Sequence, residues 1–300
     1  MFNSFTLEEN VPHSVITNLI ETLEHALTPS NPRNLSTSAL TRAKMHLNWA
    51  KDYHEALTLS DGKIDVTYIC FDQQYRFYPQ KSNFTPCVKW QKELLCGDGG
   101  PPIPLRSALT SNWVEVDIQR CHPTILATLF PHPLLVRYAM KEDMTEFGPQ
   151  SKELFLAALY AKQDYMGYNM PKAFKDMNAE LHAWANNVLK DVYPSIYQAA
   201  IDHVEEKLRF NQTDRSGVAG SFLSRVAQMI ESDLLIHAID FAGDTKVKVR
   251  ATLHDGFFVE KDGLPPTWVN DLQAYIRKQP CSYLEGRPIY IDKIVYTVKI

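Results

Sequence analysis

The amino-acid sequence predicts an α+β protein, in which helices and strands occur in separate runs along the chain. Apolar residues recur at helical spacing over residues 13–27 and 36–57, whereas they alternate with polar residues over residues 62–72 and 112–118. A mostly helical stretch follows from residue 123 to about residue 210, broken by prolines and glycines. A further long helix and further strands complete this order, which is that of an α+β chain.

The first sixty residues are expected to hold two helices. Residues 13–27 and 36–57 carry the apolar spacing of helices, and Ser14 and Ser36 are available as N-cap residues. The Pro- and Asn-rich segment between them would form the connection. At residues 59–62 the apolar period changes from that of a helix to that of a strand, which marks the best candidate boundary in the chain.

The later part of the chain combines a strand, a long helix and a hairpin. Residues 112–118 alternate as a strand after a Gly/Pro-rich connection. Residues 217–243 are predicted to form one long helix, which Gly243 would end. Residues 245–260 then alternate on both sides of a His-Asp-Gly turn, which predicts a hairpin, and residues 287–300 supply further strands.

Composition and charge restrict the classes of function. The chain has 300 residues with 45% apolar side chains, enough to bury a sizeable core, so disorder is not expected. Its formal net charge is -4 and its sequence pI is about 6.2, which gives no global attraction to nucleic acid. Any polyanionic partner must therefore meet a local basic surface, and a simple coating protein is disfavoured.

Cysteine usage and the N-terminus bear on location. The five cysteines are an odd number, with no C-x-x-C pair and no histidine partner at zinc spacing, so reduced thiols and a cytoplasmic location are expected. The N-terminus lacks a basic region followed by an apolar stretch, and no run of about 18 apolar residues occurs. We therefore expect a soluble protein without a signal peptide, a membrane span or a membrane partner.

Two aspartates lie where a sheet could hold them rigidly. Asp117 ends a predicted strand, and Asp255 lies at the tip of the predicted hairpin. Carboxylates on strand ends can hold one or two Mg²⁺ ions about 3.5 to 4 Å apart, which clamp the attacking and leaving oxygens of a phosphoryl transfer. An aspartate that ends a strand is also a frequent turn former or helix cap, and His-Asp-Gly alone is a common turn sequence. Only the combination of the two aspartates favours catalysis.

The segments around both aspartates resemble polymerase motifs. "LHDGFFV", residues 253–259, is similar to the carboxylate hairpin of the single-subunit, phage- and mitochondrial-type RNA polymerases and of the family A DNA polymerases. "VEVDIQRCHPTIL", residues 114–126, resembles the other metal-binding motif of that superfamily. The resemblance implies that Asp117 and Asp255 are the catalytic residues and bind two Mg²⁺ ions, with Mn²⁺ as a substitute. It also implies that His254 lies close to the primer end.

A third resemblance lies in "SKELFLAALYAK", residues 151–162. Lys152 precedes Tyr160 by eight residues, which matches the core of the fingers helix in both polymerase families. Eight residues make a little over two helical turns, so the two side chains share one face of the helix. The resemblance implies that Lys152 holds the triphosphate of the incoming nucleotide and that Tyr160 packs against its sugar and base.

The same segment departs from the family pattern at two positions. Gly148 stands where the family usually has an arginine four residues before the lysine, and Ala161 follows the tyrosine where glycine is usual. We therefore expect fewer contacts to the triphosphate, or contacts from another cation. The candidates for this replacement are Arg137, Lys141 and Lys162.

Two further segments fall in the family order. Gln228 precedes Asp233 by five residues in "AQMIESDLL", which is similar to the Gln-containing helix before the second carboxylate in family A. The segment "DQQYRFYPQ" resembles a segment of the single-subunit RNA polymerases, in which Asp72, Arg76 and Tyr78 match. The resemblance makes Arg76 a candidate to contact the nucleic-acid backbone or the new strand.

Several of these residues have plainer alternatives. His122, five positions after Asp117, stands where the DNA-making branch usually has a sugar-selecting glutamate and the RNA-making branch a small residue, so it fits neither. It could instead cap a helix that has Pro123 in its first turn. Gln228 could belong to the polar seam of an amphipathic helix. His254 could be a hairpin residue that hydrogen-bonds the backbone.

The resemblance covers residues 65 to 260, approximately, and implies a polymerase-like architecture. This consists of a palm with an antiparallel sheet, a helical fingers insertion and a small N-terminal helical region similar to a thumb. The expected boundaries are a thumb-like region at residues 1–60, the palm at residues 61–130 and 216–300, and the fingers-like insertion at residues 131–215.

The implied function is template-dependent nucleotidyl transfer. The partners would be a DNA template, a nascent RNA or DNA strand, nucleoside triphosphates and an additional protein subunit. RNA synthesis by a minimal RNA polymerase or primase is favoured, because "DQQYRFYPQ" resembles the RNA-making branch more than the DNA-making branch. The alternatives are a family A-like DNA polymerase of a phage, virus, plasmid or other mobile element, a non-catalytic nucleic-acid-binding subunit that retains the palm, and a metal-dependent nuclease.

Overall fold

The computed structural model describes most of the chain, with gaps. The described residues are 4–9, 11–28, 37–70, 76–79, 113–142, 144–148, 150–167, 169–210, 212–253, 256–284 and 287–299. Of the residues named above, Ser36, Asp72, His254 and Asp255 lie outside this set, and for Tyr78 only the backbone is described.

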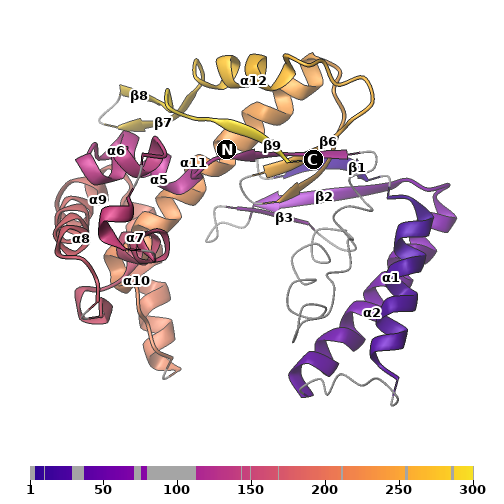
Figure 1. Cartoon of the computed structure of the whole chain (residues 1–300), viewed down its shortest axis with the longest axis horizontal. Helices are drawn as coiled ribbons and strands as arrows, with labels where there is room; N and C mark the ends of the chain where they lie inside the picture. The colour runs from indigo at the N-terminus through magenta and orange to yellow at the C-terminus, as the bar shows by residue number, and fades with distance from the viewer. Residues whose placement is uncertain are drawn as a thin grey trace.

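Antiparallel sheets form the middle of the molecule (Figure 1). In the described residues the central sheet has the strand order β5-β6-β4-β9. Its strands are β4 (Trp113–Ile118), β5 (Val249–Leu253), β6 (Gly256–Glu260) and β9 (Tyr296–Lys299). A second sheet joins β1 (Ser4–Glu9), β2 (Ile64–Cys70) and β3 (Phe77–Pro79), and β7 (Pro280–Leu284) pairs with β8 (Arg287–Tyr290). Together with the helices, these antiparallel pairs confirm the α+β class.

The register of the central sheet brings its two carboxylate-bearing segments together. Asp117 on β4 pairs with Gly256 on β6, and Gly256 also pairs with Leu253 on β5. A Cβ atom on Gly256 would lie 3.0 Å from the backbone oxygen of Val116 and 3.3 Å from Oδ1 of Asp117. Glycine therefore lets the hairpin approach β4 this closely. The predicted hairpin is confirmed.

Two helices form the N-terminal part, α1 (His13–Ala26) and α2 (Thr37–Leu59). Figure 1 shows them side by side, projecting from the sheets on the side opposite α5 to α10. Both helices were predicted, but the N-cap of α1 was not. Pro12 occupies the capping position without a side-chain hydrogen bond, so Ser14 lies inside the helix and the predicted cap is wrong. Ser36 lies outside the described residues.

The remaining helices pack around one long central helix, α11 (Gly217–Asp244), which is buried along much of its length. They are α5 (Cys121–Leu129), α6 (Pro133–Ala139), α7 (Ser151–Tyr160), α8 (Lys172–Trp184), α9 (Lys190–Val192), α10 (Pro194–Arg209) and α12 (Trp268–Ile276). The helix α11 continues through Gly243, so the prediction that Gly243 ends it is wrong. The chain turns instead at Lys246, whose φ is 58°.

No helix in the described part of the chain combines the length and the apolar character that crossing a bilayer would require.

The end of α7 is locked against the beginning of α11. A Cβ atom on Gly220 would lie only 1.9 Å from the backbone oxygen of Tyr160, so the two backbones touch at this glycine. Asp214, buried just before α11, accepts a hydrogen bond of 2.7 Å from the backbone N–H of Gly217, and Lys162 Nζ lies 3.2 Å from its carboxylate. These contacts fix Tyr160, the last residue of α7, relative to the long helix.

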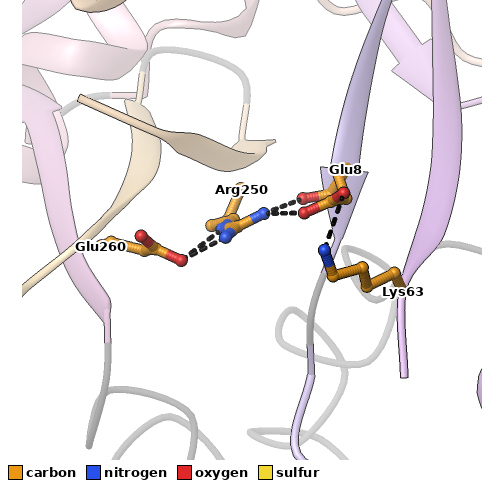
Figure 2. A network of polar contacts seen from close by, with 4 residues as sticks. All are labelled: Glu8, Lys63, Arg250 and Glu260. Carbon is orange, nitrogen blue, oxygen red and sulfur yellow. Dashed lines mark hydrogen bonds and ion pairs between the residues drawn. The ribbon is translucent and has the colours of Figure 1, made fainter. Parts of the chain in front are cut away.

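A network of charged side chains joins the base of the β5–β6 hairpin to the first strand (Figure 2). The buried guanidinium of Arg250 on β5 donates to the Glu8 carboxylate at 2.7 Å and to the Glu8 backbone oxygen at 3.1 Å. Its Nε donates to the Glu260 carboxylate on β6 at 2.9 Å. Lys63 Nζ lies 3.6 Å from the other carboxylate oxygen of Glu8. One guanidinium thus holds three strands of two different sheets.

The neighbouring carboxylate, Glu9, ties the helical pair to the same strands. Its fully buried side chain accepts a hydrogen bond of 2.8 Å from the Tyr53 hydroxyl on α2 and one of 3.0 Å from the Tyr68 hydroxyl on β2. A buried carboxylate is tolerated when such donors satisfy it. The strand β1, which the sequence did not predict, is therefore a central connection of the fold.

Candidate active site

A pocket of about 480 Å³ lies between the β4–α5 connection, α7 and α11. Five of the eight predicted site residues line it: Arg76, Asp117, His122, Lys152 and Tyr160. These residues come from three separate stretches of sequence, so it is the fold that brings them together. A volume of this size is within the range typical of small-molecule sites.

Asp117 lies on the pocket wall near the end of β4, and it is half-buried. Its neighbours across the sheet are Gly256 on one side and Thr297 of β9 on the other, and the Thr297 hydroxyl donates to the backbone oxygen of Asp117 at 3.3 Å. The sheet therefore holds the residue from both sides. A carboxylate is the hard oxygen ligand that Mg²⁺ prefers, so the donor at this position fits the metal that the sequence implies.

The second predicted aspartate, Asp255, and His254 lie outside the described residues. The residues that flank them, Leu253 and Gly256, pair with each other, and Gly256 is the direct neighbour of Asp117. The meeting of the two aspartates stays a prediction. Within the described ranges, no group of three or more His, Cys, Asp or Glu side chains is arranged to hold a metal ion.

His122 connects two other predicted residues. Its Nδ1 lies 2.8 Å from the Tyr160 hydroxyl, and its Nε2 lies 3.2 Å from Nη2 of Arg76. The helix α5 begins at Cys121, and Arg120 occupies its N-cap position. The alternative that His122 caps this helix is therefore wrong, because its side chain is used to join Arg76 and Tyr160 in the pocket.

The direction of these hydrogen bonds follows from the chemistry of the groups. A guanidinium only donates, so Nε2 of a neutral His122 ring accepts from Arg76, whereas Nε2 of a charged ring faces the Glu231 carboxylate at 3.6 Å. In both forms Nδ1 carries a hydrogen and donates to the Tyr160 oxygen. Burial raises the pKa of Tyr160, so its hydroxyl keeps its own hydrogen. That hydrogen is available to a hydroxyl or carbonyl group of a bound substrate.

Glu231 on α11 also lines the pocket, and the sequence analysis missed it. Its side chain is buried, with only 1% of its area exposed, and its carboxylate accepts from Nε of Arg76 at 2.6 Å and from Nη2 at 3.1 Å. Burial raises the pKa of Glu231, but His122 and Arg76 outweigh this and hold the pKa below its ordinary value. The available signal was a glutamate that directly follows Met229 and Ile230 in a predicted long helix, because a glutamate is buried only when it is paired.

Gln228 was named on the same helix, and the structure does not place it in the pocket lining. Its side-chain amide donates to Ser224 Oγ at 3.2 Å, one turn earlier on α11. This contact agrees with the plainer alternative of a polar seam. Glu231, three residues further along α11, is the side chain of this helix that reaches the pocket.

The three cations proposed to replace the arginine missing at Gly148 do not line the pocket. Arg137 pairs with Glu142 and Glu146, and Lys162 pairs with Asp214, while Lys141 is exposed. The pocket lining therefore gives no support to the expectation that one of them contacts the triphosphate. Lys152, in contrast, lies on the pocket wall and is exposed.

Asp233 on α11 should make the stability of the fold depend on pH. Burial raises its pKa to about 6, against an ordinary 3.8. The folded protein therefore binds the Asp233 proton more tightly than the unfolded chain does. The contribution of Asp233 to the free energy of unfolding is fully present below about pH 4 and is lost as the pH rises through about 6. We expect Asp233→Asn to raise the free energy of unfolding at pH 7 by roughly 1 to 2 kcal/mol.

Chemical denaturation at pH 4, 5, 6 and 7 measures this effect. Asp240→Asn, which changes an exposed aspartate of the same helix, is the matched control and should shift the free energy of unfolding by less than about 0.5 kcal/mol. An Asp233→Asn variant whose unfolding free energy follows the wild-type pH profile would contradict the assignment.

Comparisons with known proteins place this geometry in a wider context. No protein-family model matches the chain, and no curated protein matches it. Among solved structures, the chain is similar to the POL domain of Pol1 from M. smegmatis, determined in complex with DNA primer-template and dNTP. The sequence identity is 11% and the TM-score is 0.48, and the similarity covers 97% of this chain and 66% of that chain. A likeness at this level assigns no family, so the proposal below depends on the residues of the pocket.

Proposed function

We propose that this chain is a template-dependent nucleotidyltransferase that adds nucleotides to a growing strand. The observation that carries the proposal is the pocket, which gathers Arg76, Asp117, His122, Lys152 and Tyr160 from distant segments. The resemblance seen in the sequence implies roles in this one reaction for Arg76, Asp117, Lys152 and Tyr160. A surface of unrelated polar residues would not be expected to collect them on one wall.

Asp117 and Asp255 are the residues that would hold two Mg²⁺ ions. When bound, such ions activate the attacking 3'-hydroxyl and neutralise the leaving pyrophosphate. The contribution of the chain is to fix Asp117 between two neighbouring strands, so that its carboxylate keeps one position beside the pocket. Positioning of this kind supplies much of the rate enhancement in phosphoryl transfer.

The other pocket residues have separate roles in binding the nucleotide. Lys152, exposed on the wall, meets the negative charge of the triphosphate. Tyr160 packs against the sugar and base, and its hydroxyl is oriented by His122. Arg76, held by Glu231, is oriented toward the backbone of the new strand or the template. Glu231 therefore positions Arg76 rather than contacting the substrate.

The regions around the pocket complete the proposed enzyme. The sheet of β4, β5, β6 and β9 is its palm, the helices α6 to α10 are its fingers, and the projecting pair α1 and α2 is a reduced thumb that grips the duplex. RNA remains the proposed product, because Arg76, which belongs to the segment similar to RNA polymerases, lies in the pocket. The template is proposed to be DNA.

Strand extension on a defined template tests this proposal. Purified protein, Mg²⁺ and a labelled primer on a DNA template are incubated with four rNTPs or four dNTPs, with and without the primer. We expect extension whose sequence follows the template, so that changing one template base changes the nucleotide added at that position. Extension with rNTPs supports the RNA proposal, and extension with dNTPs alone would replace it by DNA synthesis.

Two outcomes would reject the proposal. Cleavage of the strands without extension would identify a metal-dependent nuclease. Binding of the primed template without incorporation under any of the four conditions would identify a non-catalytic nucleic-acid-binding subunit.

A further inference from the structure

Arg120 occupies a backbone conformation that residues other than glycine rarely adopt. It lies between β4 and α5 with φ 51° and ψ 45°, in the left-handed region. An L-residue in this region is strained and persists only where its surroundings hold it there. The turn is held on both sides, since the Gln119 N–H donates to the Val295 oxygen at 2.8 Å and the Thr124 N–H donates to the Arg120 oxygen at 2.9 Å. The fold therefore maintains a strained arginine three residues after Asp117.

The side chain of Arg120 is held in a defined plane on the pocket wall. Its guanidinium lies over the ring of Tyr138, with 4.1 Å from the guanidinium carbon to the ring centroid, and it donates to the backbone oxygen of Tyr138. Stacking on an aromatic ring fixes the orientation of a guanidinium without using its N–H donors. One of the five N–H donors is used by Tyr138, and the planar group presents the rest as a fork suited to phosphate oxygens.

The charges of the pocket wall leave a positive excess. Arg76 is neutralised by Glu231, whose carboxylate it binds through two nitrogens. The remaining cations on the wall are Lys152 and Arg120, and no carboxylate among the described residues forms an ion pair with either. In the described part of the wall, the negative charge that remains beside these two cations is the carboxylate of Asp117. A pocket with this excess favours a ligand that carries several negative charges.

We propose that Arg120 binds the triphosphate of the incoming nucleotide together with Lys152, and so replaces the cation that is missing at Gly148, just before α7. This inference depends on the proposed function for the identity of the nucleotide, but the recognition of a polyphosphate depends only on the pocket. Arg137 and Lys162 cannot take this role while they are paired with Glu146 and Asp214. The strained turn that carries Arg120 places the required charge next to Asp117.

Equilibrium binding tests the inference without requiring catalysis. The probes are a nucleoside triphosphate, inorganic tripolyphosphate and the corresponding nucleoside without phosphates, measured by calorimetry. Arg120→Asn removes the guanidinium, and asparagine tolerates the left-handed conformation, so the turn is retained. We expect the dissociation constants of both phosphate-bearing probes to rise about 10-fold or more, because a charge-assisted contact is lost. The affinity for the nucleoside should stay unchanged.

Lys246→Asn is the matched control. Lys246 also has a positive φ, of 58°, is exposed and follows α11, so the variant changes the same charge and the same kind of turn outside the pocket. It should bind all three probes as the wild type does. Arg120→Lys keeps the charge but loses the planar fork, and we expect an intermediate affinity. This second variant also serves if Arg120→Asn does not fold.

The outcomes separate this inference from the proposed function. If extension occurs but Arg120→Asn and Arg120→Lys bind both phosphate probes with wild-type affinity, the role of Arg120 is rejected and the enzyme proposal stands. If both variants weaken binding but no extension is found, Arg120 is a polyphosphate ligand and the enzyme proposal fails. Wild-type protein that binds neither phosphate probe would overturn the inference, as would an equal loss of affinity for the nucleoside.

Discussion

Asp117→Asn should reduce nucleotide incorporation by at least about 10³-fold, because it removes the negative charge that would hold Mg²⁺ while keeping the shape of the side chain. The fold should survive the change. Asp117 is half-buried at the pocket wall, and its main-chain contacts to Gly256 and Thr297 do not involve the carboxylate. The rate of single-nucleotide addition at saturating substrate measures the effect, and the melting temperature checks the fold.

Asp262→Asn is the control for this experiment. Asp262 is exposed in the turn after β6, so the variant removes the same charge without touching the pocket. It should extend primers at the wild-type rate. A folded Asp117→Asn enzyme that retained a tenth or more of the wild-type rate would exclude a catalytic role for this carboxylate.

Gly220→Ala should destabilise the fold by about 3 kcal/mol or more. The added Cβ would lie 1.9 Å from the backbone oxygen of Tyr160 and 3.2 Å from Cβ of Ser216, and a backbone atom can move away only by shifting the whole end of α7. Overpacking in a well-packed interior typically costs about 1 to 3 kcal/mol, and a clash with backbone is at the upper end. Denaturant unfolding measures the loss.

Gly243→Ala provides a comparison within the same helix. No atom lies within 4 Å of the Cβ that this change adds, and alanine is the better helix former, so the variant should be as stable as the wild type or up to about 1 kcal/mol more stable. Equal unfolding free energies for the two alanine variants would show that α7 and α11 do not touch at Gly220. A stable Gly220→Ala protein with weakened nucleotide binding would instead show that α7 has shifted.

Local sequence patterns predicted the helices and strands in which apolar residues recur with a clear period. The helices α1, α2 and α11 and the hairpin β5–β6 were predicted from apolar spacing, which neighbouring residues carry. Their ends were less predictable: Pro12 precedes α1 without a side-chain cap, and α11 continues through Gly243. Helix ends depend on a few local contacts that propensity does not encode.

The strand β1 and the helix α12 were not predicted at all. Residues Ser4–Glu9 alternate only weakly, and their pairing with β2 depends on partners sixty residues away in sequence. Buried polar contacts, such as Glu9 with Tyr53 and Tyr68, hold this strand in place. Pairing over such a distance is a property of the assembled sheets, so a window of neighbouring residues does not reveal it.

The candidate site shows the same difference between residues that a short motif reveals and residues whose partners are far apart in sequence. Arg76, Asp117, Lys152 and Tyr160 belong to short motifs with characteristic spacing, which the sequence displays directly. The residues that were missed, Arg120 and Glu231, lie within the quoted segments "VEVDIQRCHPTIL" and "AQMIESDLL", but the resemblance implies no role for either. Their roles arise from a left-handed turn and from a partner 155 residues away, and both become visible only in three dimensions.

The contacts of Arg250 with Glu8 and Glu260, at the base of the β5–β6 hairpin, affect the order in which the protein can assemble. Glu8 and Arg250 are separated by 242 residues, so at a synthesis rate of about 5 to 20 residues per second the first waits roughly 10 to 50 seconds for the second to be made. During that time β1 has no β5 to join, and the wall around Asp117 lacks its hairpin. A nascent chain that stops before Arg250 cannot close the sheets, so any activity must await synthesis of the β5–β6 hairpin.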